Sequence, residues 1–583
     1  MRPVWPALPY KGLGFYGPGD VPIFAGRTTD VRRCARLLGL GTTRILTLHG
    51  STGCGKSSFL RAGLIPFLEA RGHGFEFLKK NESASSQALF VRSFDRPLAR
   101  LADTLFDFVT TDYVIQTPDG PETLHLADAL LQPGPAPSVA PGGLCPPKLG
   151  PVKLSEAILD IATRADSQVV DGEVAALTVQ VLTKLASLLP RTLVLVLDQA
   201  EEVLTLKPGG LGEKGRAELF DFLSLFSKLN IDLKLVIALR TEYYGRFIYR
   251  LRYNEIEGTN IRDYLLYDVN ERELREAIEQ PTLKKDVLGY GAPWDQYHFH
   301  YEPALLDRIV QDLIHAPLEG GLLPVMQIVC GRLYKKTKKA EPWTITLADY
   351  DDLCQEGETP QSAQAKLDGL VGQIDGHLEE VLLTVCEQHH VPAKEQRAEI
   401  DRWRELLCSL VRKHVDGTVT TEIHSKEELL KMAREELKCV LDFDVVMGYL
   451  AQDQQRIVRE AEKPVRGVST DQLQGDQKIV VYSLGHDAIG LALTNWALRK
   501  NSHGLTEEQR RRFRIVGYSA FVFGLISMGT GYFNRGEMSL FLFLYGAMFM
   551  LYGSLFLFWP ERINLFLRPW MRRADTSKGA KPS

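Results

Sequence analysis

Residues 44–57 read RILTLHGSTGCGKS, and this stretch decides the fold. Its end, Gly50–Ser57, matches G-x-x-x-x-G-K-[ST], a pattern whose glycines let the backbone curl until its N–H groups point at phosphate oxygens. An apolar strand runs into the loop and an amphipathic helix (SSFLRAGLIPFLEARG) follows, so the positive end of that helix also faces the phosphates. The stretch predicts a phosphate-binding loop between the first strand and the next helix of an α/β domain.

Single residues of this loop have separate predicted tasks. Lys56 is expected to reach the β- and γ-phosphates of a nucleotide, and the Ser57 hydroxyl to hold Mg²⁺. Cys54 is either a thiol with a lowered pKa at a helix N-terminus or only a small residue at a variable position. The remaining loop residues predicted to bind the nucleotide are Gly50, Ser51, Thr52, Gly53, Gly55 and Ser58.

The composition limits the class of protein. The chain has 583 residues, too many for one core, and a prior of about 150 residues per domain predicts several domains. Lys and Arg number 69 against 73 Asp and Glu, so the net charge of −4 lacks the basic excess of a nucleic-acid-binding protein and no nucleic acid partner is expected. The 8 cysteines form no C-x-x-C pair, which is typical of reduced, cytosolic domains.

Two stretches near the C-terminal end, 515–533 and 540–559, contain no charged residue. As helices they would each be roughly 28–30 Å long, the thickness of a bilayer core, so we predict a transmembrane helical hairpin. Arginines cluster before the first stretch and after the second, whereas the short loop between them has only Arg535. The positive-inside rule then places both termini and the nucleotide domain in the cytosol.

The first 265 residues divide into a Pro/Gly-rich lead-in, 1–43, and a nucleotide domain, 44–265. The lead-in contains a predicted helix at 29–38, and the domain is expected to hold a parallel sheet sandwiched by helices. Its further predicted elements are strands near 75–78, 192–197 and 233–239, a helix at 97–108, and one long helix at 154–189. A stretch rich in Pro and Gly, 132–151, is expected to be an irregular surface insertion.

Acidic and basic residues follow the two later strands at their carboxyl ends. Asp198 directly follows TLVLVL, where an NTPase needs its second magnesium-side carboxylate, and Glu201 and Glu202 come within one turn. At least one glutamate is predicted to orient or deprotonate the attacking water, although both also suit a solvated helix start. Arg240 ends the next strand and is predicted to sense the γ-phosphate, with a surface ion pair to Glu242 as the alternative.

Six motifs occur in a fixed order along the chain: IFAGR (23–27), GSTGCGKSSFLRAGLIP (50–66), TLVLVLDQAEEVLTL (192–206), ALRTEYYGRF (238–247), LREAIEQP (274–281) and GLLPVMQIVCGRLY (321–334). This order resembles the STAND class of P-loop ATPases, and most of all its bacterial branch whose Walker B segment reads D-Q-x-E-E. The resemblance covers about residues 8 to 500. It implies an ATPase that binds ATP or ADP with Mg²⁺.

The resemblance also implies further binding residues and domains. Arg27 would contact the nucleotide, the Gly321 to Pro324 motif would close over the adenine, and His486 of a winged-helix domain would hold the ADP phosphate. A buried core histidine is an equally open interpretation of His486. The implied domains beyond the nucleotide domain are a helical domain at 266–345, a winged-helix-like and helical region at 346–509, and the hairpin with a basic cytosolic tail at 510–583.

The resemblance further implies that the protein is a switch, which is closed when ADP is bound and opens when a trigger acts and ATP is bound. Glycines recur every seven residues in both predicted membrane helices, which favours close helix contacts. Our leading hypothesis is a slow ATPase switch in the bacterial inner membrane that forms homo-oligomers after a trigger or sensor protein acts. Its clustered hairpins would then compromise or remodel the membrane, as in an anti-phage abortive-infection effector. The alternative is a tethered ATP-dependent signalling or scaffolding protein whose hairpin is only an anchor.

Overall fold

We analysed a computed structural model of the chain, which divides into two compact units, Met1–Ala492 and Leu493–Ser583. The residues that the structure describes are 5–69, 87–92, 96–111, 113–117, 120–131, 151–166, 173–189, 192–205, 211–229, 231, 233–253, 260–286, 289, 291–315, 321–337, 342–355, 363–413, 419–452, 455–464, 478–502, 522 and 548. Both predicted membrane helices lie outside these residues except for Val522 and Met548. Within the described ranges, no helix has the length and apolar character needed to cross a bilayer.

A five-stranded parallel sheet forms the centre of the nucleotide domain, in the order β2-β7-β8-β1-β9. The strands are β1 (Ile45–Gly50), β2 (Gln87–Arg92), β7 (Leu193–Asp198), β8 (Leu233–Arg240) and β9 (Ile261–Leu265). All residues of β1 and β7 are buried, as expected for strands covered on both faces. Because β8 pairs with both β1 and β7, Gly50 lies in register with Arg240. The carboxyl ends of these strands therefore meet at one edge of the sheet.

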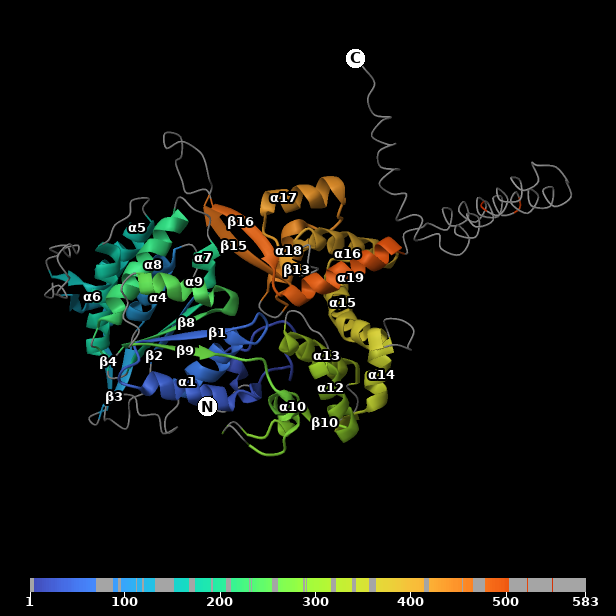
Figure 1. The fold of residues 1–583 in the computed structure, drawn as a ribbon, viewed down its shortest axis with the longest axis horizontal. Helices are drawn as coiled ribbons and strands as arrows, with labels where there is room; N and C mark the ends of the chain where they lie inside the picture. Colours follow the sequence, from blue (N-terminus) through green and yellow to red (C-terminus); the bar gives the residue numbers. More distant parts are fainter. Residues whose placement is uncertain are drawn as a thin grey trace, which may run out of the picture. The chain divides into compact units, whose positions relative to one another are not determined.

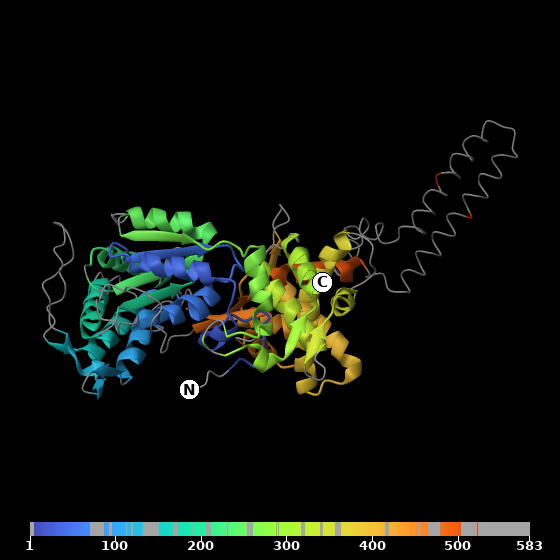
Figure 2. The ribbon, with the colours of Figure 1, turned by 90° about the horizontal axis from the view of Figure 1, so that it is seen from below.

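Helices cover both faces of this sheet, as Figure 2 shows. One face packs against α4 (Pro97–Thr110), α5 (Leu154–Asp166), α6 (Glu173–Leu188), α8 (Leu211–Ser227) and α9 (Thr241–Tyr253). The other face packs against α1 (Thr28–Gly39) and the helix after the phosphate-binding loop, which runs through α2 (Lys56–Ser58), the π-helical η2 (Phe59–Leu64) and α3 (Ile65–Glu69). The fold is thus the predicted α/β P-loop NTPase fold with a parallel sheet between helices.

Two details differ from the sequence expectations. The single long helix predicted at 154–189 is wrong, because α5 ends at Asp166, α6 begins at Glu173, and the two helices pack against each other. The sequence between them contains Asp171-Gly172, a turn-favouring pair that the apolar spacing alone does not reveal. The strand expected near 75–78 and nearly all of the insertion at 132–151 fall outside the described residues, and the second sheet strand is Gln87–Arg92.

Smaller elements complete the nucleotide domain. They are η1 (Pro18–Ile23), the β3–β4 ribbon (Tyr113–Thr117 with Gly120–Leu124), η3 (Leu126–Asp128), the β5–β6 ribbon (Leu130–Leu131 with Val152–Lys153) and α7 (Glu201–Thr205). The β5–β6 ribbon brackets the insertion, so its two ends are held together as an antiparallel pair.

A helical region follows β9 and lies close to the N-terminal lead-in (Figure 1). Its elements are α10 (Glu271–Glu279), η4 (Gln280–Thr282), α11 (Trp294–Tyr297), β10 (Phe299–Tyr301), α12 (Pro303–His315), α13 (Leu322–Thr337), β11 (Trp343–Ile345) and α14 (Leu347–Gln355). An Asn270 side chain caps α10 by accepting the Glu273 N–H, and Glu273 in turn accepts the Asn270 N–H.

The last described region of the first unit mixes helices with small antiparallel sheets. It consists of α15 (Ala363–Gln388), α16 (Ala393–Cys408), β12 (Val411–Lys413), β13 (Val419–Thr421), β14 (His424–Ser425), α17 (Lys426–Lys431), η5 (Met432–Glu436), α18 (Phe443–Ala451), β15 (Val458–Pro464), β16 (Lys478–Leu484) and the start of α19 (Asp487–Ser502). The larger sheet has the order β14-β16-β15. We call residues 424–492 the C-terminal domain of the first unit.

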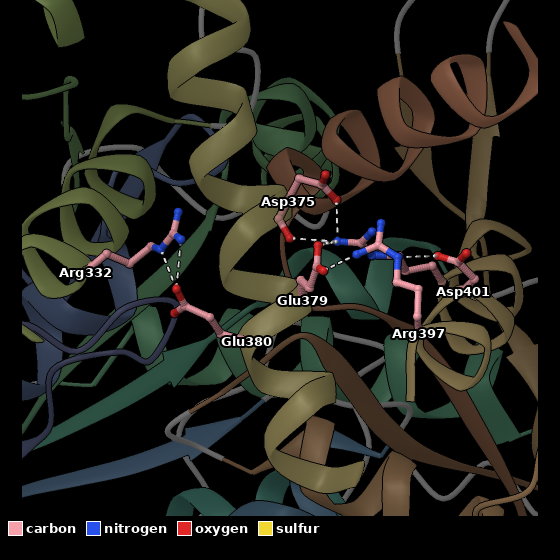
Figure 3. Close-up of polar contacts among 7 residues, drawn as sticks. Arg332, Asp375, Glu379, Glu380, Arg397 and Asp401 are labelled. Carbon is pink, nitrogen blue, oxygen red and sulfur yellow. Dashed lines mark hydrogen bonds and ion pairs between the residues drawn. The ribbon is translucent and has the colours of Figure 1, made fainter. Parts of the chain in front are cut away.

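Ion pairs connect α13, α15 and α16 (Figure 3). Arg332 of α13 pairs with Glu380 of α15 at 2.8 Å. Arg404 of α16 is 1% exposed and reaches Asp375 Oδ1 at 2.9 Å and Glu379 Oε2 at 3.1 Å on α15. Arg397 also pairs with Glu379, but from an exposed position. The Arg404 pairs are the buried link between α15 and α16.

We expect Arg404→Met to weaken the packing of α15 on α16 while keeping most of the buried side-chain volume. The substitution removes the buried charge that Asp375 and Glu379 share, at a cost of about 3 kcal/mol, although Arg397 still pairs with Glu379. Arg397→Met is the matched control, since it removes an exposed partner of the same Glu379 and should cost less than about 1 kcal/mol. Hydrogen exchange of α15 and α16 amides measures both costs, and equal effects of the two substitutions would contradict this assignment.

Candidate functional site

The phosphate-binding loop has the backbone geometry that the sequence predicts. Gly53 and Gly55 take φ values of 81° and 90°, which side chains disfavour. The Lys56 Nζ donates to the carbonyl oxygens of Gly50 and Ser51, each at 2.8 Å, so its ammonium group is held across the loop. Thr52 also lines the pocket that opens above the loop.

Ser57 and Asp198 lie in direct contact at the sheet edge. The Ser57 hydroxyl donates to Asp198 Oδ2 at 2.7 Å, and Asp198 is 2% exposed. A hydroxyl and a buried carboxylate are the hard oxygen donors that Mg²⁺ prefers, so these two residues fit the predicted magnesium ligands. They come from the second and third of the six motifs, 141 residues apart in sequence.

Glu201 and Glu202 do not share one environment. Glu201 lines the pocket, and burial raises the pKa of its carboxyl group, while Arg240 opposes that shift. Its Oε1 lies 3.4 Å from Arg240 Nε, and its Oε2 accepts the Arg240 backbone N–H at 3.3 Å. Glu202 is not among the residues that line the pocket. The ion pair that the structure gives Arg240 is thus to Glu201, rather than the Glu242 pair considered as an alternative.

Arg27 fastens the phosphate-binding loop to α1. Its guanidinium donates to the Cys54 carbonyl at 2.9 Å and pairs with Asp30 at 3.1 Å, and the residue is 4% exposed. Arg27 also lines the pocket, which is compatible with a nucleotide contact. Burial raises the pKa of the Cys54 thiol despite the nearby Lys56 and Arg27 charges. A lowered thiol pKa at this position is therefore wrong.

The Gly321–Pro324 motif packs directly against the loop. Gly321 has a φ of 98°, and a Cβ atom on it would lie 2.7 Å from Gly53 Cα. The Leu323 side chain lies 3.1 Å from the position of a Gly55 Cβ, and Pro324 lines the pocket. The start of α13 thus forms one wall of the nucleotide pocket.

Residues 10–16 form a strap that crosses between the domains. Tyr16 N–H donates to Ser58 Oγ at 3.1 Å, and Lys11 N–H donates to Gln327 Oε1 of α13 at 2.9 Å. The Tyr10 hydroxyl donates to the Ile278 carbonyl of α10 at 2.6 Å. Gly12 to Tyr16 also line the pocket. The strap therefore forms part of the nucleotide site, a role that the sequence did not indicate.

His486 reaches the same pocket from the C-terminal domain. Its Nε2 lies 3.1 Å from the Leu13 carbonyl of the strap, and its pKa falls to about 3 because the ring is buried beside Arg459, Arg456 and Arg240. A neutral ring with Nε2 protonated donates to this carbonyl. His486 is half-buried, contacts the strap and lines the pocket, so both sequence interpretations remain open.

The structure adds residues that the sequence analysis did not assign. Phe15 of the strap, Met326 and Gln327 of α13, and Arg456 and Arg459 of the C-terminal domain all line the pocket. The RIVRE stretch (456–460) carries no recognisable motif, and its arginines approach the pocket only because β15 pairs with β16 just before His486. Pocket residues therefore come from the strap, the nucleotide domain, the start of α13 and the C-terminal domain.

We expect Gly321→Ala to weaken nucleotide binding at least about tenfold, because a left-handed backbone and a Cβ contact with the loop each add strain. Gly372→Ala on α15 is the matched control, since a Cβ there meets nothing within 4 Å. Titration with a fluorescent ADP analogue measures both affinities. Unchanged affinity in Gly321→Ala would show that the α13 wall does not shape the loop.

Comparisons with known proteins place this site in a family. Among curated proteins, none matches the sequence. Solved structures that match include the Aeropyrum pernix ORC2 protein in ADPNP–ADP complexes, with 11% identity over 81% of this chain and 94% of that chain and a TM-score of 0.31. The ADP form of ORC2 has 12% identity over 82% of this chain and 95% of that chain, with a TM-score of 0.31. A chain of the E. coli MS115-1 HORMA:CdnC:Trip13 complex has 10% identity over 62% of this chain and 99% of that chain, with a TM-score of 0.28.

These TM-scores are too low to establish a common fold. The family model described as Novel STAND NTPase 1, by contrast, matches residues 9–489, a range that contains every site residue from Arg27 to His486. The chain therefore belongs to the Novel STAND NTPase 1 family.

Proposed function

We propose that the protein is an ATP-hydrolysing switch anchored in the bacterial inner membrane, and that its nucleotide state controls oligomer formation and an action of the hairpin on the membrane. The observation that carries the switch part is the meeting of the NTPase site with His486 of the C-terminal domain in one pocket. A nucleotide bound in this pocket would contact both the nucleotide domain and the C-terminal domain, so it could change the equilibrium between two arrangements of these domains.

The described residues support hydrolysis. Ser57 and Asp198 would hold Mg²⁺, which supplies positive charge beside the transferring phosphate when it is bound. Lys56 can turn from the Gly50 and Ser51 carbonyls toward the β- and γ-phosphates, since its four-carbon stem is flexible.

The Glu201–Arg240 pair supports a link between the γ-phosphate and the base. A γ-phosphate competes with Glu201 for the Arg240 guanidinium, since both are oxyanions. When Arg240 turns to the phosphate, Glu201 loses its nearest positive charge and, being buried, holds a proton more strongly. Glu201 then becomes the better acceptor for a proton from the attacking water.

The membrane part of the proposal rests on the sequence of 510–583. The stretches 515–533 and 540–559 are long and uncharged, and arginines border them on the side that would face the cytosol. One hairpin cannot enclose water, whereas several hairpins brought together by an oligomer can line an opening. This would make the protein a defence effector that acts after a phage-derived or cellular trigger.

We expect Glu201→Gln to lower the ATP hydrolysis rate by about a hundredfold or more, the usual contribution of a general base, while ATP binding persists. Glu202→Gln is the matched control and should change the rate less than about threefold, because Glu202 does not line the pocket. Steady-state phosphate release by the full chain measures both. A larger loss with Glu202→Gln would reverse the assignment.

The membrane action is tested by uptake of an impermeant dye into bacteria that express the wild type, Lys56→Ala or residues 1–509, with equal expression confirmed. We expect uptake only with the wild type, because the action needs both the nucleotide and the hairpin. A fourth chain carries an unrelated two-helix anchor in place of 510–583. Uptake by that chain, or by residues 1–509, would rule out action through the hairpin and favour a tethered scaffold.

A further inference from the structure

Arg456 and Arg459 of the C-terminal domain line the nucleotide pocket, although they lie far from the phosphate-binding loop in sequence. Arg456 lies two residues before the start of β15 and is 8% exposed, with a left-handed backbone at a φ of 44°. A non-glycine residue in this conformation is uncommon and has to be held there by its surroundings.

The surroundings of Arg456 are formed by the turn that carries His486. Gly485 packs so closely on the Arg456 carbonyl that a Cβ atom has no room, and its N–H donates to the Ile457 carbonyl at 2.8 Å. Arg459 donates to the Gly485 carbonyl at 2.8 Å. Arg456, Arg459 and His486 are therefore presented to the pocket as one rigid group.

Arg456 also contacts the strap. Its guanidinium lies over the Phe15 ring at 4.5 Å from the centroid, and the guanidinium of Arg61, from the helix after the phosphate-binding loop, lies over the same ring at 4.3 Å. Stacking engages the face of a guanidinium, whereas its five N–H donors lie along the edge. An arginine held in this way can still donate to a phosphate, with little loss of side-chain entropy on binding.

Among the residues that the structure describes, the side chains that line the pocket carry more positive than negative charge. The cationic ones are Arg27, Lys56, Arg240, Arg456 and Arg459, and the acidic ones are Asp198 and Glu201. The charges acting on the buried His486 ring, from Arg459, Arg456 and Arg240, all oppose its protonation. The pocket therefore favours an anion at the end where the C-terminal domain meets Arg240.

We propose that Arg456 and Arg459 bind the terminal phosphates of the nucleotide, so that the polyphosphate is the counter-ion that joins the C-terminal domain to the phosphate-binding loop. This inference rests on the proposed nucleotide switch and extends it to a named set of ligands. Arg456 would contribute a stacked, pre-oriented guanidinium, and Arg459 one fixed by the Gly485 carbonyl.

The test compares ADP and AMP binding by calorimetry, with the full chain in detergent and Mg²⁺ present. We expect Arg456→Gln and Arg459→Gln each to weaken ADP binding about tenfold or more, the effect of losing one charge-assisted hydrogen bond, and to change AMP binding less than about twofold. Arg459→Lys keeps the charge and should recover part of the loss. Arg434→Gln is the matched control, an exposed arginine of the same domain that does not line the pocket.

A second variant separates phosphate binding from a purely structural clamp. Phe15→Leu removes the ring under Arg456 but no charge, so it should keep the ratio of AMP to ADP dissociation constants within about threefold of wild type. An unchanged ratio in both glutamine variants, or a Phe15→Leu ratio as low as theirs, would overturn the inference. Failure of the wild type and Arg434→Gln to bind ADP would instead overturn the nucleotide switch itself.

Discussion

The structure depends on where β8 lies in the parallel sheet. Because β8 separates β1 from β7, it places Arg240 in register with Gly50 and leaves Asp198 one strand further along the same edge. This edge therefore holds the phosphate-binding loop after β1, Arg240 at the end of β8 and the buried Asp198 at the end of β7. The hydrogen bond from Ser57 to Asp198 connects the loop to the end of β7. Parallel strands deliver all their carboxyl ends to one side, so this arrangement follows from topology rather than from any single strong contact.

The strap extends this edge to the rest of the first unit. It touches the phosphate-binding helix at Ser58, α13 at Gln327 and the C-terminal domain at His486. Each contact is a single hydrogen bond, worth about 1 kcal/mol net, so none of them fixes the domains alone. Because these contacts are weak and lie beside one ligand site, the binding free energy of a ligand is large enough to change the arrangement of the domains.

The sequence predicted the parts of the site that lie near one another along the chain or follow a strand. The loop Gly50–Ser58, Asp198 and Arg240 belong to this class, since strand ends and glycine spacing are local signals. Phe15, Arg456 and Arg459 were missed because their approach depends on pairings such as β15 with β16, which leave no mark at the residues themselves. The long helix was predicted wrongly for a related reason, because the apolar spacing of the sequence continues from the range of α5 into that of α6.

The balance of charged side chains makes the pocket electrically positive. Cations from the loop, from β8 and from the C-terminal domain converge here, and Asp198 and Glu201 are the acidic residues that oppose them within the described part of the chain. Like charges brought together in a low-dielectric pocket repel. The neutral His486 contact and the Phe15 stacking together contribute about 1–2 kcal/mol to holding the domains at the pocket. Under the proposed function, a diphosphate would add negative charge at the point where the domains meet, and ADP would favour the closed arrangement. In the proposed switch, a γ-phosphate would draw Arg240 away from Glu201, so ATP and ADP would present different charge patterns to the pocket that Arg456 and Arg459 also line.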